Sequence, residues 1–208
     1  MKKVNREALI EMLQNGEDVT EVDTSGITDM NKLFYKHKEF NQDISGWDIS
    51  NVTSMCNMFK DCEKFNQDIS KWDVSNVKDM RGIFDWCVKF NQDISGWNVS
   101  SVENMKNMFC GCKEFNQNIS GWDVSSVKDM SYMFTICKEF NQDISEWNVS
   151  KVTHMDGMFD LCEKFNQDIS GWDVSKVEDM DEMFENCEIR EENKPKFCKE
   201  NWRIHYVS

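Results

Sequence analysis

Proline, histidine and basic residues are scarce in this chain. Its 208 residues include one proline and three histidines, and 24 Lys and Arg stand against 38 Asp and Glu. The formal net charge of −14 disfavours binding to nucleic acid or to anionic lipid, because both require clustered positive charge. The sequence therefore predicts no nucleic-acid partner.

Long apolar segments are missing as well. No apolar run approaches the ~20 residues of a membrane span. The segment 1–18 lacks the hydrophobic stretch of a secretory signal. From the chain as it stands we expect a soluble, cytoplasmic protein without membrane insertion, or a cell-surface protein if a leader has been removed.

Catalytic motifs are also lacking. His37, His154 and His205 lie far apart, and no nucleophile, base and orienting group recur together. The sequence has no glycine-rich phosphate loop. It predicts no enzyme and no cofactor.

What the chain does contain is one unit of 25 residues, repeated without insertion or deletion. The segment 65–75 reads Phe-Asn-Gln-Asp-Ile-Ser-Lys-Trp-Asp-Val-Ser. A fixed period of this length indicates a solenoid, whose coils are stabilised by contacts with their neighbours. Near-identical copies of the segment begin at Phe40, Phe90, Phe115, Phe140 and Phe165. The tryptophan column of the copies is Trp47, Trp72, Trp97, Trp122, Trp147 and Trp172.

Two hydrophobic periods alternate within each unit. Apolar residues over 52–62 have helical spacing, with Ser50 as the expected N-cap. Trp47 and Ile49 alternate with polar residues, which is typical of a short strand. One strand per coil, joined by a helix, must form a parallel sheet. We therefore predict an α/β repeat protein with one short parallel strand and one short helix in each 25-residue coil.

The two ends of the chain depart from the repeat. We expect an N-terminal helical cap over 1–21, with a helix between Asn5 and Gly16. Residues 22–188 are predicted to be a single solenoid of about six and a half repeats. Residues 189–208 are predicted to be a C-terminal cap, with apolar mass from Phe197, Trp202, Ile204 and Tyr206.

Cysteine is frequent, with nine residues in the chain. A disulfide framework or a metal site is one interpretation, although the chain has no CxxC pair and Cys110-Gly111-Cys112 is a lone CxC. The other is a column of buried thiols, which pack as small hydrophobic groups. Without an export signal, reduced thiols are favoured. The cysteines in register are Cys62, Cys87, Cys112, Cys137, Cys162 and Cys187.

Two polar columns accompany the tryptophans. An asparagine column is predicted to satisfy backbone groups at the turn into the strand. An aspartate column either caps turn amides or binds calcium through its carboxylates. The asparagines are Asn41, Asn66, Asn91, Asn116, Asn141 and Asn166, and the acidic column is Asp43, Asp68, Asp93, Asn118, Asp143 and Asp168.

A few positions differ between coils and are candidates for partner binding. Trp86, Ile136 and Leu161 are apolar at a position that is otherwise polar or glycine, and Tyr132 lies shortly before Ile136. If this column is exposed, it forms an interrupted apolar strip that could contact a partner. The alternative is that neighbouring coils partly cover it.

The repeated unit resembles that of a known family. Met-x-x-Met-Phe-x-x-Cys-x-x-Phe-Asn-Gln-Asp-Ile-Ser-x-Trp-Asp-Val-Ser-x-Val, over about Ile27 to Glu188, is similar to the BspA-like leucine-rich repeats of the DUF285 type. Such repeats occur in mycoplasma surface lipoproteins and other bacterial surface proteins. The resemblance implies a leucine-rich-repeat-like, right-handed solenoid and a role in adhesion or protein recognition.

The sequence thus favours a non-catalytic protein-recognition or scaffold module with a rigid acidic surface. Its partner is expected to be an unidentified protein, and the chain itself a monomer or weakly self-associating. Two alternatives remain: a structural protein that self-associates end to end, and a calcium-binding repeat protein.

Overall fold

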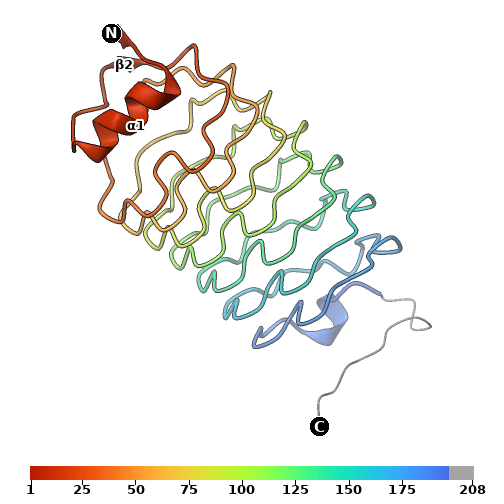
Figure 1. The fold of residues 1–208 in the computed structure, drawn as a ribbon. Coiled ribbons are helices and arrows are strands. Elements are labelled where there is room, and N and C mark those ends of the chain that lie inside the picture. The colour runs from red at the N-terminus through yellow and green to blue at the C-terminus, as the bar shows by residue number, and fades with distance from the viewer. Residues whose placement is uncertain (197–208) are drawn as a thin grey trace.

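The computed structural model describes residues 1–196. Figure 1 shows successive coils stacked along one axis, from the red N-terminal end to the blue C-terminal end. Four short elements occur in the described chain: β1 (Lys2–Lys3), α1 (Arg6–Gln14), β2 (Val22–Asp23) and the 3₁₀-helix η1 (Glu191–Asn193). The coils between β2 and η1 are built from turns.

The helix predicted between Asn5 and Gly16 is present as α1. The Asn5 side chain accepts a hydrogen bond from the backbone N–H of Ala8 at 2.9 Å, and Gly16 ends the helix region with a φ of +70°. Leu9 and Leu13 are buried against the core of the first coils. β1 pairs in parallel with β2, so the N-terminal segment closes this end of the stack.

Backbone hydrogen bonds join each coil to the next. The N–H of Asn57 donates to the carbonyl of Arg81 at 2.7 Å, and that of Phe59 donates to Ile83 at 2.9 Å. Every second backbone N–H from Met55 to Asp61 donates to the next coil in this way, and the pattern recurs from coil to coil. Parallel bridges connect Asp29, Ser54, Asp79, Asn104, Asp129, His154 and Asp179 in turn.

The helix predicted in each coil is wrong. Within the segment 52–62, residues 55–62 form consecutive turns, in which the N–H of Met58 donates to Met55 and that of Cys62 donates to Phe59. The intervening N–H groups bond to the neighbouring coil, so the bonds to the fourth preceding residue that define an α-helix are not made. A run of four-residue turns buries side chains at the same three- and four-residue spacing as a helix.

The strand predicted at 47–49 is also wrong. The backbone N–H of Trp47 closes a turn on Ile44, and no backbone N–H of 47–49 donates to another coil within residues 1–196. Ser50 caps no helix, because its N–H and hydroxyl both donate to the Asp48 carboxylate, at 3.0 and 2.7 Å. The predicted alternation of burial does occur, with Trp47 and Ile49 buried around exposed Asp48.

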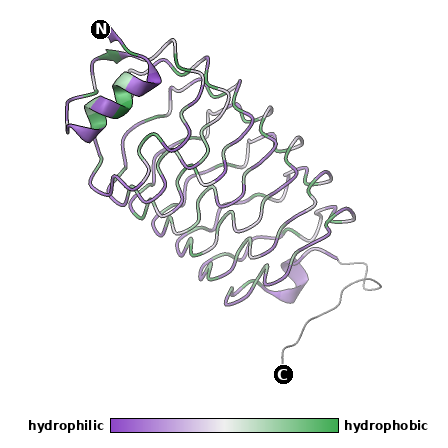
Figure 2. Ribbon diagram, viewed as in Figure 1, coloured by the Kyte–Doolittle hydropathy of each residue, from purple (hydrophilic) through white to green (hydrophobic). Residues whose placement is uncertain are grey.

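The core consists of stacked identical side chains. The ring centroids of Phe59 and Phe84 lie 5.7 Å apart, and those of Trp122 and Trp147 lie 6.5 Å apart. Each buried ring contributes roughly 2–3 kcal/mol through the hydrophobic effect. Figure 2 shows the resulting alternation of apolar and polar residues around every coil.

Candidate recognition surface

Two columns of residues with left-handed backbone run along the stack. Each lies at the third position of a turn with φ between +52° and +72°, where a type II turn favours glycine or asparagine. The first turn column is Lys32, Asn57, Gly82, Asn107, Tyr132, Gly157 and Glu182, and the second is Lys36, Asp61, Trp86, Gly111, Ile136, Leu161 and Asn186. We define the turn face as 31–38, 56–63, 81–88, 106–113, 131–138, 156–163 and 181–188.

The four residues predicted to bind a partner all lie in these columns. Trp86 and Leu161 are exposed, at 38% and 36%. Tyr132 and Ile136 are half-buried, so neighbouring coils cover part of the strip. The structure therefore places the four side chains on one face, with Tyr132 in the column beside the other three.

Their backbone conformation is costly for such residues. A left-handed backbone costs an L-residue roughly 1–2 kcal/mol, and a β-branched residue such as Ile136, with φ of +63°, is a genuine outlier there. Some of the equivalent positions in other coils hold glycine or asparagine, as at Gly82, Asn107 and Gly111, and others hold charged residues. The chain thus carries large apolar side chains where its own repeat offers residues that avoid the cost.

Each of the two aromatic rings lies over a glycine of the next coil. A Cβ on Gly111 would lie 2.9 Å from Cδ2 of Trp86, and a Cβ on Gly157 would lie 2.4 Å from Cδ1 of Tyr132. The Lys113 ammonium lies 5.6 Å from the Trp86 ring centre, within the range of a cation–π contact. These contacts fix the orientation of both rings.

Tyr132 has polar neighbours on both sides. The Lys106 ammonium lies 5.5 Å from its ring centre. A hydrogen bond to Asp156, together with burial, raises the pKa of the Tyr132 phenol to about 12. The phenol therefore stays protonated at physiological pH.

A partly buried ion pair lies within the turn face. Lys60 Nζ lies 2.6 Å from Asp85 Oδ2, and the Asp85 side chain is 4% exposed. Burial raises the pKa of Asp85 against the opposing effect of Lys60, and burial raises the pKa of Cys110 next to it to about 12. The sequence contains the information needed to predict this ion pair, because Lys60 and Asp85 occupy equivalent positions of consecutive coils.

The tryptophan column is held by its ring nitrogens as well as by packing. Trp72 Nε1 donates to the carbonyl of Ile44 at 3.2 Å, and Trp97 Nε1 to Ile69 at 3.1 Å. Each indole N–H therefore satisfies a carbonyl of the preceding coil, and the ring itself is buried. These residues position the turn face and do not reach it.

The asparagine column forms a ladder along the stack. The Asn66 Oδ1 atom accepts a hydrogen bond from the Asn91 N–H at 2.9 Å, and Asn91 Oδ1 accepts from the Asn116 N–H at 3.0 Å. The ladder runs on through Asn141 to Asn166, which accepts from the Arg190 N–H.

The cysteine column is buried. Cys87 Sγ donates to the carbonyl of Phe59 and Cys112 Sγ to that of Phe84, both at 3.0 Å. Burial raises the pKa of Cys87 and Cys112 well above the ordinary thiol value. Cys187 is less buried, and Cys198 lies outside the described residues.

The aspartate column closes turns. Asp43 Oδ1 accepts the Ser45 N–H and Asp68 Oδ1 accepts the Ser70 N–H, both at 2.9 Å. These hydrogen bonds lower the pKa of both carboxyl groups. Asn118 makes the same bond to Ser120 without a charge. Within residues 1–196, no three His, Cys, Asp or Glu side chains converge as metal ligands.

The histidines are not brought together. His154 is exposed, and its Nδ1 lies 2.9 Å from the Thr153 hydroxyl. His37 is half-buried at the other end of the stack, and His205 lies outside the described residues. Among the described residues, the structure therefore does not bring His37 and His154 together.

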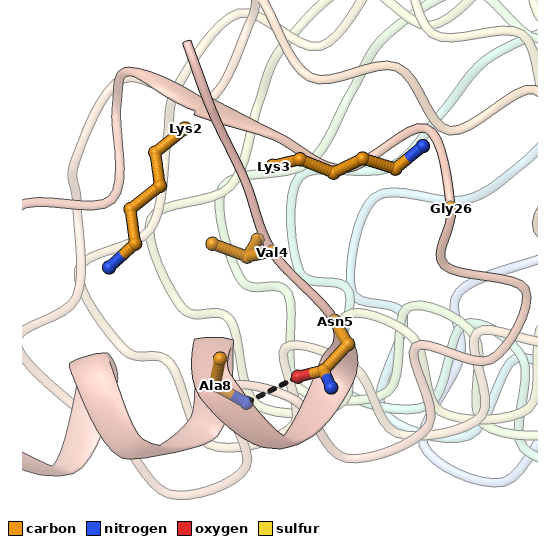
Figure 3. Close-up of a pocket in the computed structure, with 6 residues that line it drawn as sticks. All are labelled: Lys2, Lys3, Val4, Asn5, Ala8 and Gly26. Carbon is orange, nitrogen blue, oxygen red and sulfur yellow. Dashed lines mark hydrogen bonds between the residues drawn. The ribbon is translucent and has the colours of Figure 1, made fainter.

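A shallow cavity of about 340 Å³ lies beside the start of α1. Its lining side chains of Lys2 and Lys3 point in opposite directions, while Asn5 caps the helix through Ala8 (Figure 3). The two ammonium groups therefore do not converge on one ligand. The predicted C-terminal cap residues Phe197, Trp202, Ile204 and Tyr206 lie outside the described part of the chain.

A known protein family matches the repeated part of the chain. The family model described as "Mycoplasma protein of unknown function, DUF285" matches residues 4–120 and 92–197. The chain belongs to the DUF285 family. Neither the curated proteins nor the solved structures include a significant match. Within residues 1–196, no helix of this DUF285 protein has the length and apolarity needed to cross a membrane.

Proposed function

We propose that this DUF285 protein is a non-catalytic protein-recognition or scaffold module, built as a right-handed solenoid of the BspA-like, leucine-rich-repeat type. The coil-to-coil hydrogen bonds and the stacked core support a rigid array. Trp86, Tyr132, Ile136 and Leu161 on the turn face form its contact strip.

One observation carries this proposal. Trp86 and Leu161 occupy costly left-handed positions and still expose more than a third of their surface. Strained conformations of this kind concentrate at functional sites. A partner that covered both side chains would gain about 25 cal/mol for each Å² of apolar surface buried.

Quantitative capture from the native lysate under reducing conditions tests the proposal. The natural chain is compared with Trp86→Ala/Tyr132→Ala/Leu161→Asp. A matched control, Lys71→Ala/Glu146→Ala, alters two exposed residues outside the turn face. Circular dichroism checks that all three chains fold.

We expect one protein to be captured by the natural chain and the control, and lost with the triple variant. The captured protein, purified, must then bind the natural chain directly. Capture that is unchanged in the triple variant would contradict the assignment of the contact strip.

A further inference from the structure

The turn face carries opposite charges at its two ends. In the first coil, which contributes 31–38 to the turn face, Lys32, Lys36 and Lys38 are all exposed. Among the described residues only Lys38 of these three forms a salt bridge, with Glu63 at 2.7 Å, while Lys36 Nζ lies 5.0 Å from the Tyr35 ring centre. The residues of the last coil on the same face are acidic. They are Asp181, Glu182, Glu185 and Glu188, all exposed.

The apolar side chains lie between these two charged ends. Trp86 is in the third coil and Leu161 in the sixth, with Gly111 in the fourth, central coil. Along the axis the turn face therefore runs from a positive first coil, through coils that carry Trp86, Tyr132 and Ile136 together with Lys106 and Lys113, to a negative last coil. Such a pattern is self-complementary when a copy of it is turned end for end.

We infer that the partner of the turn face is a second copy of this chain, packed antiparallel about a two-fold axis near the fourth coil. The inference rests on the proposed recognition function and supplies its partner. An isologous interface needs a patch that complements itself. In this arrangement Lys32 and Lys36 of each copy face the acidic last coil of the other.

The antiparallel arrangement also covers the exposed apolar surface. The third coil of one copy lies opposite the fifth coil of the other, so Trp86 meets the region of Tyr132 and Ile136. Trp86, Tyr132 and Ile136 then lie near the centre of the interface, Leu161 lies opposite the second coil, and the charged first and last coils form the rim. Rim charges mainly set the orientation and speed of association.

End-to-end stacking is less compatible with the structure. β1 and α1 cover the first coil, and β1 is paired with β2. At the other end, Asn193 Nδ2 donates to the Asn166 carbonyl at 3.0 Å, and the Ile169 N–H donates to the Asn193 carbonyl at 2.9 Å. Stacking would displace these contacts, whereas the turn face is already exposed. A parallel face-to-face pair would place like charges together.

Sedimentation equilibrium of the full chain, from micromolar to several hundred micromolar, tests the inference. The first-coil reversal is Lys32→Glu/Lys36→Glu, and the last-coil reversal is Glu182→Lys/Glu185→Lys. The control Lys71→Glu/Lys151→Glu makes the same change in net charge as the first-coil reversal, at exposed residues outside the turn face.

We expect the natural chain to form dimers, and each reversal to weaken them about tenfold. An equimolar mixture of the two reversals should restore dimers, because each altered end then meets the opposite charge. The control should dimerise like the natural chain.

Three results would overturn the inference. If the natural chain stays monomeric, a second copy is not the partner of the turn face. The proposed recognition function is then tested by the capture experiment alone. Dimers that survive both reversals but not Trp86→Ala/Leu161→Asp exclude the antiparallel arrangement and keep the contact strip. Dimers unaffected by any of these changes place the interface elsewhere and also contradict the contact strip.

Discussion

The indole of Trp86 occupies the space that a side chain on Gly111 would need. A Cβ on residue 111 would lie 2.9 Å from Cδ2 of the indole. The aromatic ring of Trp86, at a left-handed position of one coil, is thus accommodated by glycine at the same position of the next. Tyr132 and Gly157 repeat the relationship two coils further on, between the fifth coil and the sixth.

This dependence predicts strong coupling between the two residues. Gly111→Ala should lower the free energy of unfolding by about 2–3 kcal/mol, through left-handed strain plus overpacking. In a Trp86→Ala background the same change should cost only about 1 kcal/mol. Urea denaturation of the four chains measures the coupling. The control Gly121→Ala, with nothing within 4 Å of the new Cβ, should be nearly neutral. Equal losses in both backgrounds would contradict the coupling.

Glu182 allows the backbone strain to be measured without loss of packing. It is exposed, with φ of +57°. Because glycine adopts this conformation without cost, Glu182→Gly should stabilise the protein by about 0.5–1 kcal/mol. Glu178→Gly, exposed and outside the left-handed columns, should destabilise it by a similar amount. A loss of stability in both variants would show that the left-handed positions are not strained.

The asparagine ladder predicts a requirement for its acceptor oxygen. Asn116 Oδ1 accepts from the Asn141 N–H at 3.0 Å and from Gln142 Nε2 at 2.9 Å. Asn116→Ala should therefore cost about 1 kcal/mol in thermal or urea unfolding. Asn116→Asp keeps the acceptor and should retain most of the stability at neutral pH. If Asn116→Asp were less stable than Asn116→Ala, the stabilisation would come from the amide N–H₂ group and not from the acceptor oxygen.

The buried thiols predict instability at alkaline pH. Burial raises the pKa of Cys87, Cys112 and Cys137 in the folded state. Above the ordinary thiol pKa the unfolded chain ionises and the folded one does not, so unfolding releases protons and stability falls as pH rises. Each thiol should contribute a slope of about −1.4 kcal/mol per pH unit above a pH of about 8.5. The stabilisation is complete below that pH.

Urea midpoints between neutral pH and about pH 10 measure this slope. Cys112→Ala should make the fall of stability with pH less steep by the contribution of one thiol, although the variant is less stable than the natural chain at every pH. A slope that is unchanged by removing Cys112 would contradict the assignment.

Calcium should not stabilise the protein. The oxygens of Asp43 and Asp68 already accept serine N–H groups, and Asn118 substitutes for aspartate in the same turn. A ligand that binds only the folded state must raise its melting temperature. We expect the same melting temperature in chelator and in millimolar calcium. A rise of several degrees would revive the calcium-binding alternative.

The period of the sequence revealed more than its local patterns did. Identical residues 25 positions apart, such as Trp122 and Trp147, stack whatever the conformation of the backbone between them. The apolar spacing over 52–62 does not distinguish consecutive turns from an α-helix, because both bury residues at the same spacing. Asn57, Gly82 and Asn107 were the available signal, since asparagine and glycine alternating at one position indicate left-handed backbone.

The residues proposed as the contact strip can be selected from the sequence, but their conformation cannot. Trp86 and Leu161 stand out because they replace polar residues or glycine at one position of the repeat. Their left-handed backbone, and the glycine beneath Trp86, appear only in the structure. The opposite charges of Lys32 and Glu182 can be seen in the sequence. The inference of a self-complementary face depends on the structural finding that both residues lie on one face.

The most direct test of the turn face as a contact surface is photo-cross-linking from position 86. Trp86 is replaced by a photoreactive aromatic residue, and adducts formed by the concentrated protein are mapped by mass spectrometry. The antiparallel pair predicts an adduct to a second copy within 130–138. Adducts confined to residues outside the turn face would contradict the account.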